Sequence, residues 1–182
     1  MSLGPLNETA IEPMREAIRT IGGKDVSVDD VRRRVAESGV WGDHGIEYGV
    51  WHGDTLLGVV QAVACPFRDP RDTYEVGILI MDPKQRGQGL GFQALSLLLA
   101  HLFDERRALR VWFTTDEDNV AMRRLGEHLG FRLEGILRGG REVQGRLIDE
   151  AMYGMTRDDP RSPFAPGDHP AHGYPSLPSD PS

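Results

Sequence analysis

The sequence contains little cysteine, few aromatic residues and no surplus of basic side chains. Its 182 residues include one cysteine and 7% aromatic residues. A single cysteine rules out an intrachain disulfide and is typical of a cytoplasmic protein. Lys and Arg number 21 against 28 Asp and Glu, which gives a net charge of −7. This balance argues against a general nucleic-acid binder, whose phosphate contacts favour a basic face, and it suits a cationic or amine-bearing partner.

Long hydrophobic runs are also missing. The longest strongly apolar stretch spans residues 95–99, whereas a helix needs about 20 apolar residues to cross a bilayer. The first residues lack the basic and apolar regions of a signal peptide. We therefore expect a cytoplasmic protein with no membrane partner. Hydrophobic residues still make up 39% of the chain, which is enough for a folded core.

Proline is scarce except at the end of the chain, where residues 159–182 contain seven of the 12 prolines. This stretch has few aliphatic residues and no helical or strand period, so it cannot bury enough apolar surface to offset its ordering entropy. We predict a folded domain over residues 1–158 and a disordered tail over 159–182. His169 and His172 lie in the tail without further ligands, and no metal site is expected.

Hydrophobic periodicity predicts a mixed α/β fold. Apolar residues recur every three or four positions in four segments, and they alternate or run continuously in seven others. The strand–helix–strand segment over 74–114 requires a parallel crossover, whereas hairpins require antiparallel pairs, so the sheet is expected to be mixed. The predicted helices cover residues 11–21, 28–38, 95–102 and 119–129, and the predicted strands cover residues 3–6, 46–51, 55–65, 74–81, 109–114, 131–137 and 143–155.

A glycine-rich loop is the sharpest local feature. The segment Gln85-Arg86-Gly87-Gln88-Gly89-Leu90-Gly91 follows a predicted strand and opens a predicted helix. Its glycines let a ligand approach the backbone, and the first N–H groups of the helix point outward at the positive end of the helix dipole. Arg86 adds a fixed positive charge. We predict that the loop binds an anion such as a pyrophosphate; the alternative is a flexible turn without a ligand.

Two common phosphate-binding loops do not fit this segment. A Walker loop places Lys directly after its last glycine, and no Lys follows these glycines. The dinucleotide fingerprint requires its third glycine at position 92, which is Phe92. The spacing that is present is Arg-x-x-Gly-x-Gly, at Arg86, Gly89 and Gly91.

This spacing resembles that of the GCN5-related N-acetyltransferase (GNAT) superfamily. Asp82-Pro83 precedes the loop, and an Asn-led helix ends in Leu129-Gly130-Phe131, as in that family. Residues 75–87, 129–138 and 149–150 resemble its ribosomal-protein-alanine acetyltransferase-like branch. The resemblance covers residues 45–157, and its order and spacing are more specific than any single motif.

The resemblance implies a mostly antiparallel seven-stranded sheet, splayed between its fourth and fifth strands and flanked by about four helices. Acetyl-CoA would lie in the opening, and no metal would be needed. Asn119 would contact the pantetheine or an ordered water, and Arg123 or Arg124 a phosphate of CoA. The pyrophosphate would be bound by the amides of Arg86, Gly87, Gln88, Gly89, Leu90 and Gly91, and the pantetheine by the backbone of Leu79, Ile80 and Met81, which would also polarise the thioester carbonyl.

Attack of an amine on a thioester needs a proton acceptor and N–H donors for the oxyanion. Glu75 alternates with the apolar Tyr74 and Val76, so we predict that it faces the acceptor side and acts as the base. It could equally order the cleft or bind the ammonium while water carries the proton. Asp149 matches the family motif and is the second acceptor-site candidate, although a strand carboxylate could equally be structural.

The sequence departs from the family at the general acid. Many family members carry Tyr four residues before the Gly-Phe pair, where this chain has Gly126. The closer branch often has Ser three residues after the Asn, where this chain has Met122. No side chain can therefore be named as the acid, but a thiol with a pKa near ~8.5 can leave as thiolate without one.

Several other residues have ordinary structural interpretations. Cys65, on an apolar strand, is expected to pack rather than to act as a nucleophile. His52 and His128 are expected at the surface, and His101 on the exposed side of its helix. The acidic run 116–118 is expected to supply the N-cap of the next helix rather than to recruit a cationic acceptor. Acceptor-pocket candidates that could instead belong to the core are Trp41, Trp51, Phe67 and Arg68.

These observations predict an N-acetyltransferase that moves an acetyl group from acetyl-CoA to a primary amine by direct attack in a ternary complex. The acceptor is left open between a small-molecule amine, an antibiotic or its precursor among them, and a protein N-terminus. The alternative is a catalytically degenerate CoA-binding protein with a regulatory or interaction role. Neither nucleic acid nor membrane is expected as a partner, and a homodimer is left open.

Overall fold

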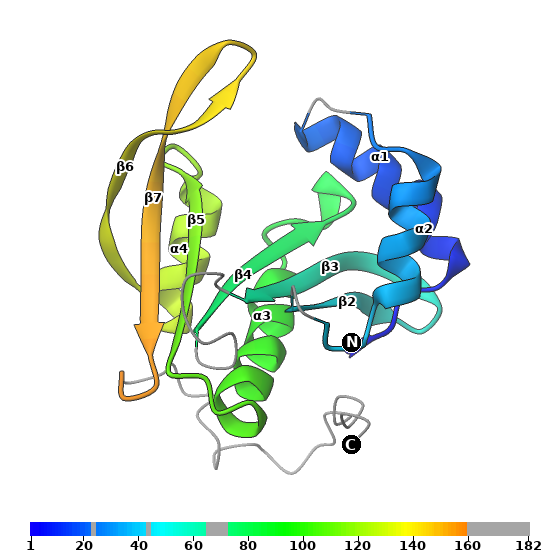
Figure 1. The fold of residues 1–182 in the computed structure, drawn as a ribbon, viewed down its shortest axis with the longest axis horizontal. Helices are drawn as coiled ribbons and strands as arrows, with labels where there is room; N and C mark the ends of the chain where they lie inside the picture. The colour runs from blue at the N-terminus through cyan, green and yellow to red at the C-terminus, as the bar shows by residue number, and fades with distance from the viewer. Residues whose placement is uncertain (23–24, 43–44, 65–72, 160–182) are drawn as a thin grey trace. The chain divides into compact units, whose positions relative to one another are not determined.

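The computed structural model describes residues 1–22, 25–42, 45–64 and 73–159. Within these residues it confirms the predicted mixed α/β fold, with seven strands and four α-helices (Figure 1). The helices are α1 (Ile11–Gly22), α2 (Val28–Glu37), α3 (Leu90–Ala100) and α4 (Val120–Leu129). The strands are β1 (Ser2–Gly4), β2 (Gly45–His52), β3 (Thr55–Ala64), β4 (Thr73–Ile80), β5 (Arg110–Asp116), β6 (Arg132–Val143) and β7 (Arg146–Thr156). Shorter helical turns cover Glu8–Ala10, Pro83–Gln85 and the π-helical His101–Glu105.

The strands follow the order β1-β2-β3-β4-β5-β7-β6. The pairs β1–β2, β2–β3, β5–β7 and β6–β7 are antiparallel, and β4–β5 is parallel, as the crossover required. The ladder between β4 and β5 covers Thr73–Glu75 and Arg110–Trp112. Within the described residues this ladder has no further pair, and β4 itself continues to Ile80.

Contacts within the chain divide it into two compact units. The first unit contains the described residues of 1–63 and 77–98, and the second contains those of 64–76 and 99–159. The glycine-rich loop belongs to the first unit, whereas Glu75, Asn119 and Asp149 belong to the second.

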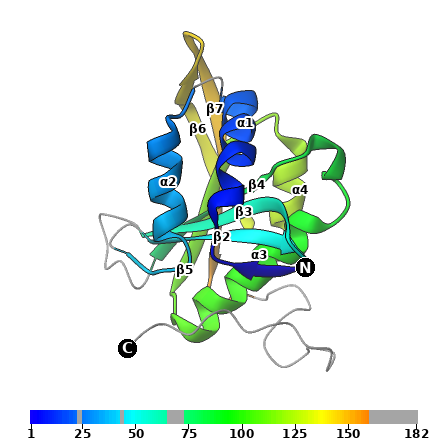
Figure 2. The same ribbon diagram turned by 90° about the vertical axis from the view of Figure 1, so that its right-hand side faces the viewer.

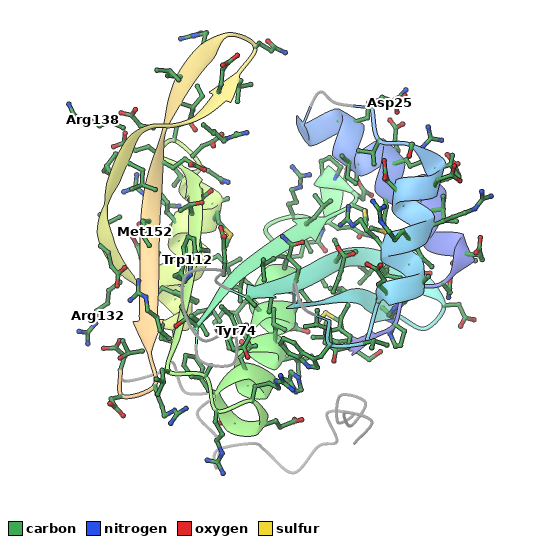
Figure 3. All side chains as sticks on the ribbon, viewed as in Figure 1. Asp25, Tyr74, Trp112, Arg132, Arg138 and Met152 are labelled. Carbon is green, nitrogen blue, oxygen red and sulfur yellow. The ribbon has the colours of Figure 1, made fainter. Side chains whose placement is uncertain are left out.

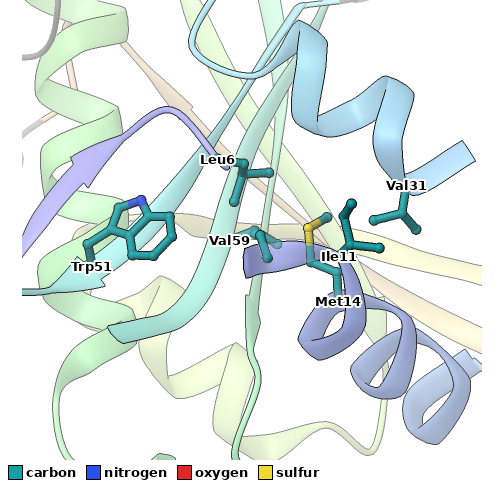
Figure 4. Close-up of a cluster of buried hydrophobic side chains, with 7 residues drawn as sticks. Leu6, Ile11, Met14, Val31, Trp51 and Val59 are labelled. Carbon is teal, nitrogen blue, oxygen red and sulfur yellow. The ribbon is translucent and has the colours of Figure 1, made fainter. Parts of the chain in front are cut away.

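The first unit packs α1 and α2 on one face of its strands and α3 on the other (Figures 1 and 2). Helices α1 and α2 are amphipathic, and their apolar sides meet the strands in a buried cluster (Figure 4). The Ser27 side chain accepts a hydrogen bond from the Asp30 N–H at 3.0 Å and so caps the start of α2. Trp51 is 8% exposed and belongs to this core rather than to an acceptor pocket. The cluster contains Leu6, Ala10, Ile11, Met14, Val31, Trp51 and Val59.

The second unit packs α4 against one face of β5 and β7. Phe113 stacks on Tyr153 with ring centres 5.1 Å apart and meets Phe131 edge-on at 5.0 Å. Strands β6 and β7 run side by side in both views (Figures 1 and 2). The prediction that β6 ends at residue 137 was wrong, because an irregularity in the ladder between Leu137 and Arg141 absorbs the two glycines that follow, and the strand continues to Val143.

Two further expectations were wrong. His101 is 5% exposed, not on the exposed side, and its Nδ1 lies 3.0 Å from Oε2 of Glu105. The α-helical period ends before it, and a π-helical turn changes which side chains face the core. The acidic run does not cap α4: the cap is Asn119, and Asp116 instead forms an ion pair with Arg141.

Some expectations fall on residues outside the described ranges. These are the packing of Cys65, the pocket roles of Phe67 and Arg68, and the tail with its two histidines. The domain boundary at residue 158 stays a prediction, and Asp159 accepts a hydrogen bond from the Thr156 N–H at 2.8 Å. No helix within the described part of the chain is long and apolar enough to cross a membrane.

Candidate active site

The glycine-rich loop connects β4 to α3 and leaves its backbone open. The Asp82 side chain accepts a hydrogen bond from the Lys84 N–H at 2.9 Å and starts the short turn that leads into the loop. Gly87 and Gly89 have φ values of 74° and 82°, a left-handed conformation that favours glycine. A Cβ at either position would meet no atom within 4 Å. A ligand can therefore approach the loop directly.

The start of α3 supplies unbonded N–H groups beside these glycines. The Gln93 N–H donates to the Gly89 carbonyl at 3.1 Å, which is the first bond of the helix. The N–H groups of Leu90 and Gly91 precede that bond and have no helical partner. Together with the dipole of α3 they favour an anion, so the open loop fits the pyrophosphate that the sequence predicts.

Two predicted side chains also hold the loop in shape. Arg86 donates from Nη2 to the Ile80 carbonyl at 3.2 Å, and Gln88 donates from Nε2 to the Lys84 carbonyl at 2.9 Å. Arg86 keeps further N–H donors beyond this one bond. It also lines a pocket of about 350 Å³ between α1 and the loop, together with Met81, Asp82 and Pro83. The structure therefore brings the predicted residues Arg86 and Met81 to one place.

The end of β4 was predicted to bind the pantetheine through Leu79, Ile80 and Met81. The Met81 N–H donates to the Leu57 carbonyl at 2.9 Å and is used by β3. Because alternate residues of a strand direct their backbone groups to opposite neighbours, Ile80 directs its N–H and carbonyl away from β3. Of the three predicted residues, Ile80 thus has the backbone orientation that a ligand could pair with, and its carbonyl already accepts the hydrogen bond from Arg86.

Glu75 lies near the start of β4, in the second unit, and is half-buried. It pairs with Trp112 in the β4–β5 ladder, so the two side chains share a face of the sheet. Burial, and then the carboxylate of Glu150, raise the pKa of Glu75 above its ordinary value. A carboxylate that holds its proton more tightly is also a stronger base once ionised, which suits the predicted role.

The face that carries Glu75 has charges of both signs. Arg110 forms an ion pair with Glu134, and Arg141 forms one with Asp116. Trp112 and Met152 lie on the same face, on β5 and β7 (Figure 3). The sequence analysis did not select Trp112, because its place beside Glu75 depends on the parallel register.

Asp149 and Glu150 are neighbours in β7 and point to opposite faces. Glu150 pairs with Asp116 in the ladder and so shares the face of Glu75. Asp149 points the other way, and its carboxylate accepts a hydrogen bond from the Gly139 N–H at 2.8 Å. The structure therefore brings Glu150, not the predicted Asp149, to the face of Glu75. The alternation of side chains along a strand predicts that these two carboxylates lie on opposite faces. Only the register of β7 shows which of them shares the face of Glu75.

The Asn119 side chain caps α4. Its Oδ1 accepts a hydrogen bond from the Met122 N–H at 3.2 Å, and its Nδ2 donates to Oγ1 of Thr115 at 2.9 Å. Arg123 donates from Nε to the Tyr153 hydroxyl at 3.2 Å and from Nη1 to the Glu117 carbonyl at 2.8 Å. Both predicted ligands of CoA are thus already bonded within the second unit.

Gly126 stands where many family members carry a tyrosine, and it is buried. A Cβ at this position would lie 2.7 Å from Cε1 of Phe113, closer than real side chains approach. The Phe113 ring is buried between Tyr153 and Phe131 and cannot move away cheaply. The packing of Phe113 therefore explains why α4 carries no side chain here.

Metal chemistry has no candidate site in the ranges that the structure describes. No group of three or more His, Cys, Asp or Glu side chains there could hold a metal ion.

The comparisons with known proteins agree with this geometry. Residues 6–132 match the family model of the acetyltransferase (GNAT) domain. The chain therefore belongs to the GNAT acetyltransferase family, whose members use acetyl-CoA as co-substrate.

Particular relatives can also be named. The chain is 38% identical over 108 residues to a mycothiol acetyltransferase of Geodermatophilus obscurus, a match that covers 58% of this chain and 34% of that relative. It therefore spans about a third of that relative's length.

Among solved structures, a chimera of spermidine N-acetyltransferase from Vibrio cholerae and hSSAT superposes with a TM-score of 0.73 at 18% identity, covering 86% of this chain and 96% of that one. A GNAT-family acetyltransferase from Bacillus anthracis has a TM-score of 0.70 at 19% identity, covering 86% and 95%. Because the sequence identities are low, these two similarities show a shared fold and nothing further.

Proposed function

We propose that this acetyltransferase transfers the acetyl group of acetyl-CoA to a primary amine by direct attack in a ternary complex. The observation that carries the proposal is the open loop at the end of β4, where Gly87 and Gly89 expose backbone next to the unbonded N–H groups of α3. Such a site suits the pyrophosphate of acetyl-CoA. Bound there, acetyl-CoA supplies an activated thioester carbonyl.

The residues of this chain would then divide the work between backbone and side chains. The amides of residues 87–91 and the Arg86 side chain bind the pyrophosphate, and the Ile80 N–H pairs with the pantetheine, because the Arg86 N–H and the Ile80 carbonyl already have partners. Glu75 accepts the proton that the attacking amine must lose, directly or through a water. Burial raises the pKa of Glu75, and the negative charge of Glu150 raises that pKa further, which supports this role. Asp149 would act by binding the Gly139 N–H, and Asn119 by capping α4.

No general acid is assigned to the leaving thiolate. Phe113 fills the space beside Gly126, so α4 offers no hydroxyl there. A thiol with a pKa near ~8.5 is a fair leaving group without protonation.

The net charge and a neighbour by fold support a cationic amine as the acceptor. An acidic chain suits a cationic amine, and one neighbour by fold is named for spermidine, an amine. A small-molecule amine and a protein N-terminus both satisfy this chemistry, the latter in keeping with the ribosomal-protein-alanine acetyltransferase-like branch. The single cysteine supports a cytoplasmic location, and a homodimer stays a prediction.

The test is an acceptor screen with thiol-release detection. Purified protein is mixed with acetyl-CoA and a panel of primary amines and N-terminal peptides, and free CoA is followed with a thiol reagent. Acceptor-dependent release of CoA is the expected result. Tight CoA binding without turnover on any acceptor would instead support the degenerate CoA-binding protein.

Glu75→Gln tests the base. We expect kcat to fall about 100-fold, the usual size of a general-base effect. The wild-type rate should fall as pH drops through the raised pKa of Glu75, and the variant should lose this acidic limb. An unchanged pH profile would show that Glu75 only orders the cleft.

Glu75 should also make the stability of the protein depend on pH, in the direction opposite to its effect on the rate: as pH rises, the rate increases and stability falls. The folded pKa of Glu75 is raised, so the folded state binds a proton more tightly than the unfolded state. Its contribution to stability is complete below the ordinary pKa of 4.5 and is lost as pH rises through the folded value. The free energy of unfolding, measured with urea, should therefore decrease between about pH 4 and about pH 7, and this decrease should be smaller for Glu75→Gln than for the wild type.

A further inference from the structure

The first unit contains a pocket of about 550 Å³ that the sequence analysis did not predict. Its walls are the last turns of α2 with the residues that follow, the start of β2 and the end of β3. The volume falls within the range of about 300–1,000 Å³ typical of small-molecule sites. Val40 and Val63 line it and are 54% and 36% exposed, so the pocket offers aliphatic surface to a ligand.

The charges that line this pocket leave a small negative surplus. Arg34 donates to both carboxylate oxygens of Glu47, and this ion pair is neutral overall. Glu37 also lines the pocket and forms no ion pair within the described residues. The lining therefore favours an ammonium group and disfavours a carboxylate.

Gln61 connects this pocket to β4. Its side chain lines the pocket and lies against Gly77: a Cβ on Gly77 would be 3.1 Å from Nε2 of Gln61. Because Gly77 has no side chain, the carboxamide rests directly on the strand. The amide is exposed and forms no hydrogen bond within the described residues.

The position of Gly77 in β4 gives this contact its meaning. Side chains two residues apart in a strand point to the same face, so Gly77 shares a face with Glu75 before it and Leu79 after it. These positions are the predicted base and the first residue of the predicted pantetheine site. Gly77, on which the Gln61 carboxamide rests, is therefore two residues along the chain from the predicted base and two from the first residue of the predicted pantetheine site.

We propose that this pocket binds the amine acceptor and that the side-chain oxygen of Gln61 accepts a hydrogen bond from the acceptor nitrogen. The acceptor is a compact primary amine with a mostly hydrocarbon body that carries no carboxylate. Val40 and Val63 contact the hydrocarbon, and Glu37 supplies the negative charge that attracts the ammonium on entry. This inference rests on the proposed acetyl transfer and adds the class of acceptor.

Two probes of nearly equal shape test the charge preference. n-Hexylamine has the proposed chemistry, and 6-aminohexanoate adds only a carboxylate at the far end. With saturating acetyl-CoA, we expect kcat/KM for n-hexylamine to exceed that for 6-aminohexanoate by at least about tenfold. Equal use of the two probes would overturn the proposal.

Three variants test Gln61. Gln61→Ala should raise the KM for n-hexylamine about tenfold, the usual effect of one hydrogen bond to a charged group. Gln61→Glu keeps an acceptor oxygen and should hold that KM at or below the wild-type value. Thr55→Ala, an exposed change at the other end of β3, is the matched control. The KM for acetyl-CoA should stay constant in all three, because Gln61 does not line the cofactor loop.

Saturation-transfer NMR of n-hexylamine with the protein alone gives a readout without turnover. Signal on the alkyl chain that weakens in Gln61→Ala but persists in Thr55→Ala supports the pocket. Use of peptides but not alkylamines, or equal KM values in Gln61→Ala and Thr55→Ala, overturns this inference and leaves the proposed acetyl transfer intact. Absence of CoA release with every acceptor overturns the acetyl transfer itself.

Discussion

The glycine-rich loop of the first unit and helix α4 of the second unit were both predicted to bind CoA, and they differ in what they leave unbonded. The loop exposes backbone, and a side chain at Gly87 or Gly89 would meet nothing within 4 Å. In α4 the Asn119 and Arg123 side chains already have partners, and Gly126 is packed against Phe113. Glycine therefore has a different structural role in each region. In the loop it leaves open space beside the backbone, and in α4 it allows the Phe113 ring to pack against the helix.

Gly126→Ala should give the largest effect. The added Cβ would lie 2.7 Å from Cε1 of Phe113, whose ring is held by two aromatic neighbours. Overpacking of this kind costs about 2 kcal/mol of unfolding free energy, measured by urea denaturation. Gly135→Ala in β6 is the matched control, because a Cβ there meets nothing within 4 Å. Adding Phe113→Leu should recover part of the loss; equal losses in Gly126→Ala and Gly135→Ala would contradict the packing argument.

Gly89→Ala should affect the cofactor more than the fold. Its φ of 82° costs an alanine about 1 kcal/mol of backbone strain, and the new methyl group lies where the pyrophosphate is proposed to bind. We expect the KM for acetyl-CoA to rise about tenfold, equivalent to about 1.4 kcal/mol. Gly53→Ala carries the same kind of strain in the β2–β3 turn, with a φ of 56°, and should leave that KM unchanged. A similar rise in both variants would show that strain, rather than lost binding, is the cause.

Arg123→Met should lower stability without weakening cofactor binding. The change removes hydrogen bonds to the Tyr153 hydroxyl and the Glu117 carbonyl, so the free energy of unfolding should fall. The Tyr153 hydroxyl keeps its bond to Glu127 at 3.0 Å, so it is not left without a partner. Arg124→Met is the comparison, because Arg124 is exposed and forms no ion pair within the described residues. We expect Arg124→Met to keep its stability within about 0.5 kcal/mol and to raise the KM for acetyl-CoA about threefold; the reverse pattern would make Arg123 the ligand of CoA.

The same comparison shows how far the sequence could predict the site. The open geometry of the loop was predictable because Arg-x-x-Gly-x-Gly after a strand allows few other structures, and its binding of CoA stays a prediction. The roles of Asn119 and Arg123 were harder to predict because a helix cap and a bond to a buried tyrosine use the same side chains. The place of Glu150 beside Glu75 depends on the register of the strands, and the place of Gln61 depends on its close approach to Gly77. Neither relation can be seen in the spacing of residues along the sequence.

Most of the fold was predictable because its hydrophobic residues repeat regularly along the helices and strands, and because these elements are short. The exceptions have local causes. The irregular ladder at Leu137 lets β6 continue past two glycines that look like a turn, and the π-helical turn places His101 in the core. In both places the backbone departs from the regular geometry on which periodicity depends.

Asn119 provides the finest test, because its cap and its predicted role at CoA can be separated. Asn119→Ala removes the bond to the Met122 N–H and should cost about 1 kcal/mol of stability. Asn119→Asp keeps that capping oxygen and loses the donor that now bonds Thr115, so its stability should stay within about 0.5 kcal/mol of the wild type. If Asn119 only caps α4, both variants keep the wild-type KM for acetyl-CoA. A raised KM in Asn119→Asp, without a matching loss of stability, would show that the amide group also contacts the cofactor, and α4 would then resemble the loop in binding CoA directly.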